Sequence, residues 1–282
     1  METHPDQITR IILPARLTDD QQRLLVKYLR LPRSLSRQEW AQALAAFDLL
    51  HEGRVQCGDE TMTFQQFYPR AIDSLHANAF IDELLGATDA GIAGKHLTEK
   101  YWREINTGLA ALGVVGATAE ERALLVYCLY WWRSFCKGYS REVAVFRDLE
   151  RSGVEFEAHD LRAPASRRTV YDLIVLGRWG DVKNSTYFIH TARSFPLRCD
   201  FYIARLWDET ADRWLDLVLL KPEAWHELNG EPTPCSWEAV QQVLPAAAEI
   251  VLRGEALIVV PYEKWKACVL RRQARERKDT TE

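Results

Sequence analysis

Residues 179–185 read WGDVKNS, and residues 171–177 just before them read YDLIVLG, an apolar run that carries its own aspartate. Side chains at positions i and i+2 of a β-strand project to the same face of the sheet. If WGDVK is extended, Asp181 and Lys183 therefore share one face, and Val182 points into the core. The fold of this region depends on where the turn between the two stretches lies.

A two-residue turn at Leu176-Gly177 would pair the two stretches as a β-hairpin. Asp172 would then lie directly opposite Asp181, with their Cβ atoms roughly 4.5–5.5 Å apart. Leu-Gly is a poorer hairpin turn than Asn-Gly, so the turn residues alone do not settle the register. This register predicts Asp172, Asp181 and Lys183 side by side on one exposed face of a strand.

Two carboxylates at this separation repel each other, and a divalent cation between them removes the repulsion. Mg²⁺ suits such a site because it binds through one or two carboxylates and keeps several waters. A metal-bound water can attack phosphorus while the metal stabilises charge on the phosphoryl oxygens. The pattern predicts Asp172 and Asp181 as metal ligands and Lys183 as the group that orients or deprotonates the water.

A different register removes the site. If the turn lies at residues 182–185, residues 169–179 form one strand and residues 186–193 form the other. Asp181 and Lys183 then become ordinary turn residues, in positions that Asp and Asn favour. Strand register therefore decides between a metal site and a surface turn.

The composition is typical of a globular protein, with 282 residues, 47% hydrophobic and 27% charged, enough for one large domain or two ordinary ones. The longest apolar stretch, residues 123–132, is too short to cross a bilayer, and residues 1–10 lack a signal-peptide pattern. The six cysteines show neither CxxC pairing nor a histidine spacing suited to zinc. We expect a cytoplasmic protein with reduced thiols and no membrane partner.

The charge distribution is more informative than the net charge of −4, which argues against a protein that coats nucleic acid by bulk charge. Residues 161–206 carry eight basic residues and only three acidic ones. Basic residues around a small acidic centre suit a phosphodiester substrate, although ordinary surface arginines on exposed strands would give the same number of basic residues. The residues that we expect to contact nucleic acid are Arg167, Arg168 and Arg178.

The first part of the chain, residues 1–137, is dominated by helical periodicity and leaves room for a short strand around Val55. Thr118-x-x-Glu121 fits a capping box that opens a very apolar helix reaching Phe135. We find no concentration of chemically active residues here. This part predicts an all-α N-terminal domain.

The second part, residues 138–282, alternates helices and short strands. A helix over residues 140–151 stops at Gly153, further helices cover residues 236–252 and the stretch from Tyr262 onward, and β-like runs cover residues 154–158, 169–176, 187–191, 201–207, 214–220 and 256–260. This order predicts a mixed sheet packed by helices, in an α/β or α+β domain.

The second part resembles the PD-(D/E)xK phosphodiesterase superfamily, which contains restriction-type endonucleases and Holliday-junction resolvases. The resemblance covers residues 138–207: helix SREVAVFRDLERSG with Glu142, first strand VEFEA, YDLIVL with Asp172, and DVK with Asp181 and Lys183. The family pattern has an αβββαβ core with these residues in this order. Tyr171 stands where the family often has proline, and the spacing between the two aspartates is short.

The resemblance implies a restriction-endonuclease-like mixed sheet flanked by helices and an Mg²⁺- or Mn²⁺-dependent nuclease that acts on DNA, or on RNA. The catalytic residues would be Asp172, Asp181 and Lys183. The metal ligands would be Glu142, Asp172 and Asp181, with Glu155 and Glu157 as competitors for the helix glutamate.

Two alternatives belong to other functional classes. The same fold could serve as a non-catalytic nucleic-acid-binding or assembly module, or the chain could be a helical interaction protein whose sheet carries no site. The N-terminal part would bind substrate, a protein partner or the second subunit of a homodimer. Convergence of Asp172, Asp181 and Lys183 favours the enzyme.

Overall fold

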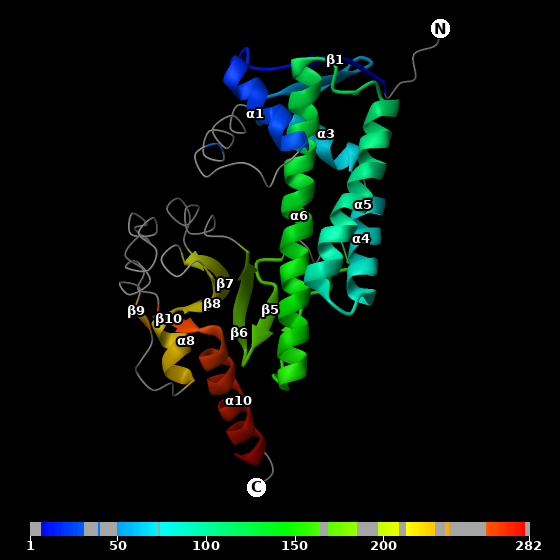
Figure 1. Ribbon diagram of the computed structural model, residues 1–282. Coiled ribbons are helices and arrows are strands. Elements are labelled where there is room, and N and C mark those ends of the chain that lie inside the picture. The colour runs from blue at the N-terminus through cyan, green and yellow to red at the C-terminus, as the bar shows by residue number, and fades with distance from the viewer. Residues whose placement is uncertain are drawn as a thin grey trace. The chain divides into compact units, whose positions relative to one another are not determined.

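The computed structural model contains two compact units, one within Met1–Thr88 and Ile92–Lys137 and the other within Asp89–Gly91 and Gly138–Glu282 (Figure 1). The described residues are 7–30, 39, 50–72, 74–163, 169–184, 197–208, 213–228, 235–236 and 258–279. The protein is of mixed α/β class, with helices and two separate sheets. Each unit has its own sheet, and each is described by itself below.

The first unit is not all-α, so the expectation from the sequence is wrong at this point. It contains a three-stranded antiparallel sheet with the order β1-β2-β3. The strands are β1 (Ile8–Ile12), β2 (Arg54–Cys57) and β3 (Glu60–Thr63), and the helices are α1 (Asp19–Arg30), α3 (Phe64–Ala71), α4 (Ser74–Gly86), α5 (Ala90–Ala111) and the first half of α6 (Ala119–Ser152). The short strand expected around Val55 is β2. Its buried Val55 lies opposite the buried Met62 of β3, and this pair gives the sheet its apolar face.

Helix α6 begins at the predicted capping box and runs without a break for 34 residues. The Thr118 hydroxyl accepts from the Glu121 backbone N–H at 3.1 Å, and the Glu121 carboxylate accepts from three backbone N–H groups of the preceding loop. The sequence predicted a break near Gly138, but the helix continues through it. The helix ends where predicted, because Gly153 takes a left-handed φ of 75°.

The second unit is built on a seven-stranded mixed sheet with the order β4-β5-β6-β7-β8-β10-β9. All neighbouring strands are antiparallel except β6 and β7, which are parallel. The strands are β4 (Glu157–Ala158), β5 (Leu173–Val175), β6 (Arg178–Lys183), β7 (Phe201–Asp208), β8 (Arg213–Leu220), β9 (Cys235–Ser236) and β10 (Ile258–Pro261). The strand expected over residues 187–191 and most of the helix expected over residues 236–252 lie outside the described residues.

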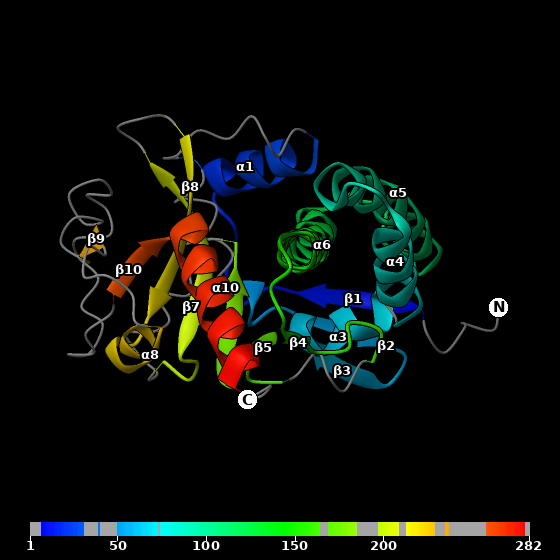
Figure 2. The same ribbon diagram turned by 90° about the horizontal axis from the view of Figure 1, so that it is seen from below.

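Helix α10 (Tyr262–Asp279) packs on this sheet, and α8 (Pro222–Glu227) follows β8 (Figure 2). Gly180 of β6 lies beside Phe201 of β7, and the Phe201 ring packs on Trp265 of α10 with ring centroids 5.3 Å apart. Both aromatic rings are buried. Gly180 and Val182 therefore face α10, and Asp181 and Lys183 lie on the opposite face of β6.

The β5–β6 hairpin has the register that creates the site. Val175 pairs with Arg178, and Leu173 pairs with Gly180. The turn is Leu176-Gly177, with φ values of 51° and 72° that correspond to a type I′ turn. The alternative turn at residues 182–185 is wrong, because Val182 and Lys183 pair with β7 as part of β6.

We predict that Gly180→Ala lowers the free energy of unfolding by ~1–3 kcal/mol, the usual cost of overpacking a core. A Cβ at this position would lie 2.1 Å from the Phe201 ring, which is buried against Trp265, so the ring or the strand would have to shift. Urea denaturation followed by circular dichroism measures the change.

The matched control is Gly138→Ala in α6, where an added Cβ meets nothing within 4 Å. Alanine is the better helix former, so this variant should be neutral or more stable by up to ~1 kcal/mol. Equal stabilities for the two variants would contradict the packing of Phe201 over Gly180.

Candidate metal and catalytic site

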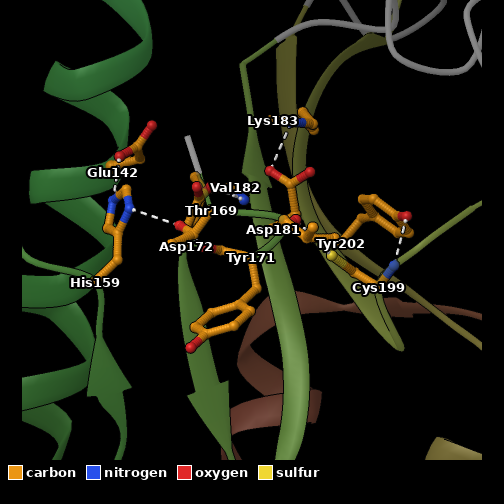
Figure 3. A network of polar contacts seen from close by, with 11 residues as sticks. Glu142, His159, Thr169, Tyr171, Asp172, Asp181, Val182, Lys183, Cys199 and Tyr202 are labelled. Carbon is orange, nitrogen blue, oxygen red and sulfur yellow. Dashed lines mark hydrogen bonds and ion pairs between the residues drawn. The ribbon is translucent and has the colours of Figure 1, made fainter. Parts of the chain in front are cut away.

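Four segments of the second unit bring acidic and basic side chains together (Figure 3). Asp172 lies just before β5, Asp181 and Lys183 lie on β6, Glu142 lies on α6, and His159 follows β4. Backbone hydrogen bonds fix the segments: His159 N–H donates to the Asp172 carbonyl at 2.9 Å, and Asp172 N–H donates to the Gly180 carbonyl at 2.9 Å. The site is therefore built on the ends of paired strands and one long helix.

The Asp172 side chain occupies the point where β5 and β6 separate. The ladder between the strands ends at Leu173 and Gly180. Beyond that pair, the Asp172 carboxylate accepts from the Val182 backbone N–H at 2.7 Å, in place of a carbonyl from β5. The carboxylate is held rigidly, because a strand that pairs on its other edge with β7 positions its donor.

Asp181 and Lys183 share one face of β6, as the sequence predicts. The Lys183 Nζ lies 2.6 Å from the Asp181 Oδ1. The prediction that this face of the strand is exposed is wrong for Asp181, which is only 9% exposed and is one of the buried charged residues. Lys183 keeps 35% of its side chain exposed, so it can reach a bound molecule while Asp181 stays covered.

Burial and mutual repulsion perturb the acidic groups. Burial and the charge of Glu142 raise the pKa of Asp172 above its ordinary value of 3.8. Burial, together with the neighbouring Asp172 carboxyl, raises the pKa of Asp181 to about 7, although the charge of Lys183 opposes the shift. Strongly perturbed carboxyl groups with a specific charge partner are typical of functional sites.

Lys183 is a cation at neutral pH. Burial lowers its pKa, but the charges of Asp181, Asp172 and Glu142 outweigh burial and leave the pKa above the ordinary value. Of the two roles that the sequence allows for Lys183, this favours orienting water and neutralising charge over removing a proton. One ammonium group faces three carboxyl groups, so the cluster lacks positive charge.

The structure places a histidine where the sequence predicts only carboxylates. One possible ligand atom each from Glu142, His159 and Asp172 lie within 4.8 Å of one another. Opposite oxygens around Mg²⁺ are about 4.2 Å apart, so this donor set suits one divalent ion after small adjustments. Asp181, the third expected metal ligand, lies beside Asp172 and pairs with Lys183 instead.

Of the three candidate glutamates, the structure brings Glu142 to the cluster. Glu155 forms an ion pair with Arg277 at 3.6 Å, and Glu157 is exposed on β4. Glu142 is close enough to Asp172 to raise its pKa, and its Oε2 lies 3.2 Å from the His159 Nε2. Of the three glutamates, Glu142 is therefore the one that belongs to the cluster.

Thr169 and Glu142 contact the two ring nitrogens of His159. The Thr169 hydroxyl oxygen lies 3.3 Å from the His159 Nδ1 and 2.7 Å from the Tyr171 carbonyl oxygen, and the His159 Nε2 lies 3.2 Å from the Glu142 Oε2. The direction of each bond to the ring depends on which nitrogen carries the hydrogen. In the tautomer with the hydrogen on Nδ1, the Thr169 oxygen accepts it and Nε2 can bind a cation, which is the usual orientation of metal-binding histidines.

His159 had no recognisable signal in the sequence. It is 17 residues from Glu142 and 13 residues from Asp172, and no ligand-spacing motif covers such intervals. Its position depends on how α6 packs against the segment after β4. A short hydrophilic stretch between two strands, His159-Asp160, was the one local feature that could have drawn attention to it.

The arginines expected to contact nucleic acid are only partly described. Arg167 and Arg168 lie outside the described residues. Arg178 forms two hydrogen bonds to the Glu227 carboxylate of α8 and lies 3.9 Å from Asp200. A nucleic-acid contact by Arg178 stays a prediction, and it would have to compete with Glu227.

No protein-family model, curated protein or solved structure matches the chain. Among the helices of the described residues, including the 34-residue α6, none is both long and apolar enough to cross a membrane. The functional argument therefore rests on the chemistry of the cluster.

We predict that Asp172→Asn raises the free energy of unfolding at pH 7 by ~0.5–2 kcal/mol, within the usual range for substitutions that relieve a strained functional site. The amide oxygen can still accept from Val182 N–H, and no charge remains to be buried beside Glu142. Because the pKa of folded Asp172 is raised, wild-type stability falls as the pH rises from 3.8 through the raised value. The variant should lose this part of the pH dependence in urea titrations.

Asp148→Asn is the control, and we expect it to change the stability in the opposite direction. Burial raises the pKa of Asp148, but the hydrogen bond from Lys266 at 2.6 Å outweighs burial and leaves the pKa below its ordinary value. Its ion pair stabilises the fold above the ordinary carboxyl pKa, and this contribution disappears as the pH falls. The control should therefore destabilise the protein at pH 7. A loss of stability in both variants would contradict the charge imbalance at Asp172.

We also predict that Thr169→Val weakens Mn²⁺ binding ~10–100-fold, the usual cost of removing a group that orients a metal-binding histidine. The methyl group keeps the shape of threonine but removes the hydroxyl that contacts the His159 Nδ1. Isothermal titration of the metal alone measures the affinity, and His159→Ala should weaken it further. Thr107→Val of α5, where the hydroxyl donates to the Arg103 carbonyl at 2.9 Å, is the matched control. Unchanged affinity in Thr169→Val would remove Thr169 from the site.

Proposed function

We propose that the protein is a divalent-metal-dependent nuclease that hydrolyses phosphodiester bonds in DNA, with a PD-(D/E)xK type of site. The observation that carries the proposal is the convergence of Asp172, Asp181 and Lys183 with the helix residue Glu142. Strand periodicity predicts the register that gathers three of these residues. The preceding helix adds Glu142 at the same place.

The connectivity of the second unit supports the proposal. Helix α6 precedes three antiparallel strands, β4, β5 and β6, and the next strand, β7, runs parallel to β6. A parallel neighbour needs a crossover connection, and residues 185–196 between the two strands lie outside the described residues. A helix, an antiparallel meander and a parallel fourth strand are the arrangement expected for a restriction-endonuclease-like core.

The donor set fits Mg²⁺ or Mn²⁺. The two carboxylates suit Mg²⁺ and Mn²⁺, whereas an imidazole ligand is commoner at Zn, Fe and other transition metals, so the carboxylates carry the assignment. We assign Glu142, His159 and Asp172 to hold the ion, with Asp181 completing the acidic side of the site. When bound, the ion supplies Lewis-acid polarisation of a phosphoryl oxygen and a more acidic water.

Three side chains of the cluster bind the phosphate or hold one another in position. Lys183, a partly exposed ammonium, can hold a non-bridging phosphoryl oxygen and stabilise the charge that develops on it. Asp181 fixes the position of Lys183 through their ion pair. Asp172 holds its carboxylate in one orientation through the Val182 N–H. Burial keeps these interactions strong, since little water surrounds them.

We predict that the protein cleaves supercoiled or branched DNA only with Mg²⁺ or Mn²⁺. Asp181→Asn and Lys183→Met should each reduce the rate by at least ~100-fold, the usual cost of removing one preorganised electrostatic group. Gel assays with the metals, with EDTA and with RNA of matched sequence measure the requirement and the substrate class.

Glu157→Gln is the matched control, because Glu157 is an exposed acid on the adjacent strand and takes no part in the cluster. It should cleave as the wild type does. Cleavage that persists in both Asp181→Asn and Lys183→Met would contradict the assignment of these residues to the catalytic site. DNA binding without cleavage under any metal would instead favour a non-catalytic nucleic-acid-binding module on the same fold.

A further inference from the structure

An exposed aromatic pair adjoins the acidic cluster. The Trp179 ring packs on Tyr171 with ring centroids 5.2 Å apart and an interplanar angle of 33°. Despite this contact, Trp179 remains 45% exposed, one of the few large apolar residues that the described surface leaves open. We call Tyr171 and Trp179 the aromatic platform. The open part of its ring is available to stack on a planar ligand such as a nucleobase.

The platform is placed by the same strands that place the acids. Trp179 precedes Asp181 by two residues on β6, so both side chains lie on one face with Cα atoms about 7 Å apart. Tyr171 directly precedes Asp172 in the chain, and Figure 3 shows it beside that residue. A phosphate held at the cluster would therefore carry a nucleobase within reach of the Trp179 ring.

The backbone of the platform is held in place. Trp179 N–H donates to the Asp200 carboxylate at 3.0 Å, and Asp200 N–H donates back to the Trp179 carbonyl at 2.8 Å. The Thr169 hydroxyl fixes the Tyr171 carbonyl. A ring that is already positioned loses little conformational freedom on binding, which favours recognition.

We infer that the aromatic platform stacks an unpaired nucleobase next to the phosphate held at the cluster. The substrate class is therefore DNA that is single-stranded or has unpaired nucleotides at the cleavage position. Bases within a duplex stack on each other and offer no free face, whereas each base of a single strand has a π-face for an aromatic side chain. The inference rests on the proposed function for the position of the phosphate.

Trp214 provides a matched comparison within the same unit. It is 47% exposed, almost the same as Trp179, and lies on β8. Arg205 lies over its ring at 5.5 Å, and no member of the acidic cluster is on β8. If DNA bound exposed tryptophans in general, both Trp179 and Trp214 would contribute to the affinity. The platform predicts a contribution from Trp179 and none from Trp214.

The test measures binding without cleavage. In the Asp181→Asn background with Mg²⁺ present, fluorescence anisotropy gives the affinity for an oligothymidylate of about 12 nucleotides, within the usual range for one single-strand-binding fold. An abasic oligonucleotide of equal length serves as the second ligand. Trp179→Ala should weaken binding to oligothymidylate at least about fivefold and leave the abasic ligand unchanged. Trp179→Phe should retain most of the affinity, and Trp214→Ala all of it.

Three binding results would overturn the inference. In the first, the parent fails to bind oligothymidylate. In the second, Trp179→Ala binds it as tightly as the parent does. In the third, Trp179→Ala loses equal affinity for oligothymidylate and for the abasic ligand. Equal losses in Trp179→Ala and Trp214→Ala would also overturn it. A melting temperature of Trp179→Ala equal to that of the parent establishes that the variant is folded.

Cleavage assays separate this inference from the proposed function. Wild-type protein should cut DNA with single-stranded tails faster than blunt duplex, and Trp179→Ala should lose this preference. If the wild type cuts nothing but the binding results hold, the nuclease proposal fails and the platform stands. If the wild type cuts blunt and tailed DNA equally and Trp179→Ala changes neither rate, the platform fails and the nuclease proposal stands.

Discussion

The register of the β5–β6 hairpin is the constraint on which the rest of the second unit depends. Because side chains alternate between faces, a slip of one residue would move Asp181 to the α10 face and Gly180 to the acidic face. The turn at Leu176-Gly177 is where the register begins, and two contacts hold it: the packing of Gly180 on Phe201, and the hydrogen bonds between Trp179 and Asp200. The core therefore fixes the position of each acidic group.

The acidic cluster is a destabilising element that the surrounding structure supports. Three carboxyl groups and one ammonium group are gathered where burial raises the pKa of Asp172 and Asp181. Lys183 relieves only part of this repulsion, and the His159 Nε2 lies 3.2 Å from the Glu142 carboxylate on the other side of the cluster. A bound cation would balance the remaining negative charge. For the same reason, removing one of the negative charges should raise the stability of the fold.

The sequence predicted those parts of the fold and of the candidate site that depend on local patterns. The hairpin pairing of Asp172 with β6 follows from strand periodicity, and the end of α6 follows from Gly153. The β1–β3 sheet was missed because Val55 and Met62 are too few to form an alternating pattern. The continuity of α6 through Gly138 was missed because glycine disfavours helix locally while the packing of the long helix does not. His159 was missed because only tertiary contacts bring it to Glu142.

The turn at Leu176-Gly177 has a consequence for how the protein folds. Leucine at a φ of 51° is a poor residue for a type I′ turn, so the isolated hairpin should form slowly and open often. Pairing of β6 with β7 joins Gly180 to Phe201, 21 residues further along the chain, so it closes a longer loop than the hairpin does. We expect the hairpin to stay paired only once β7 has joined it. The mutually repelling carboxylates would then be fixed in place after the neighbouring strand, not before it.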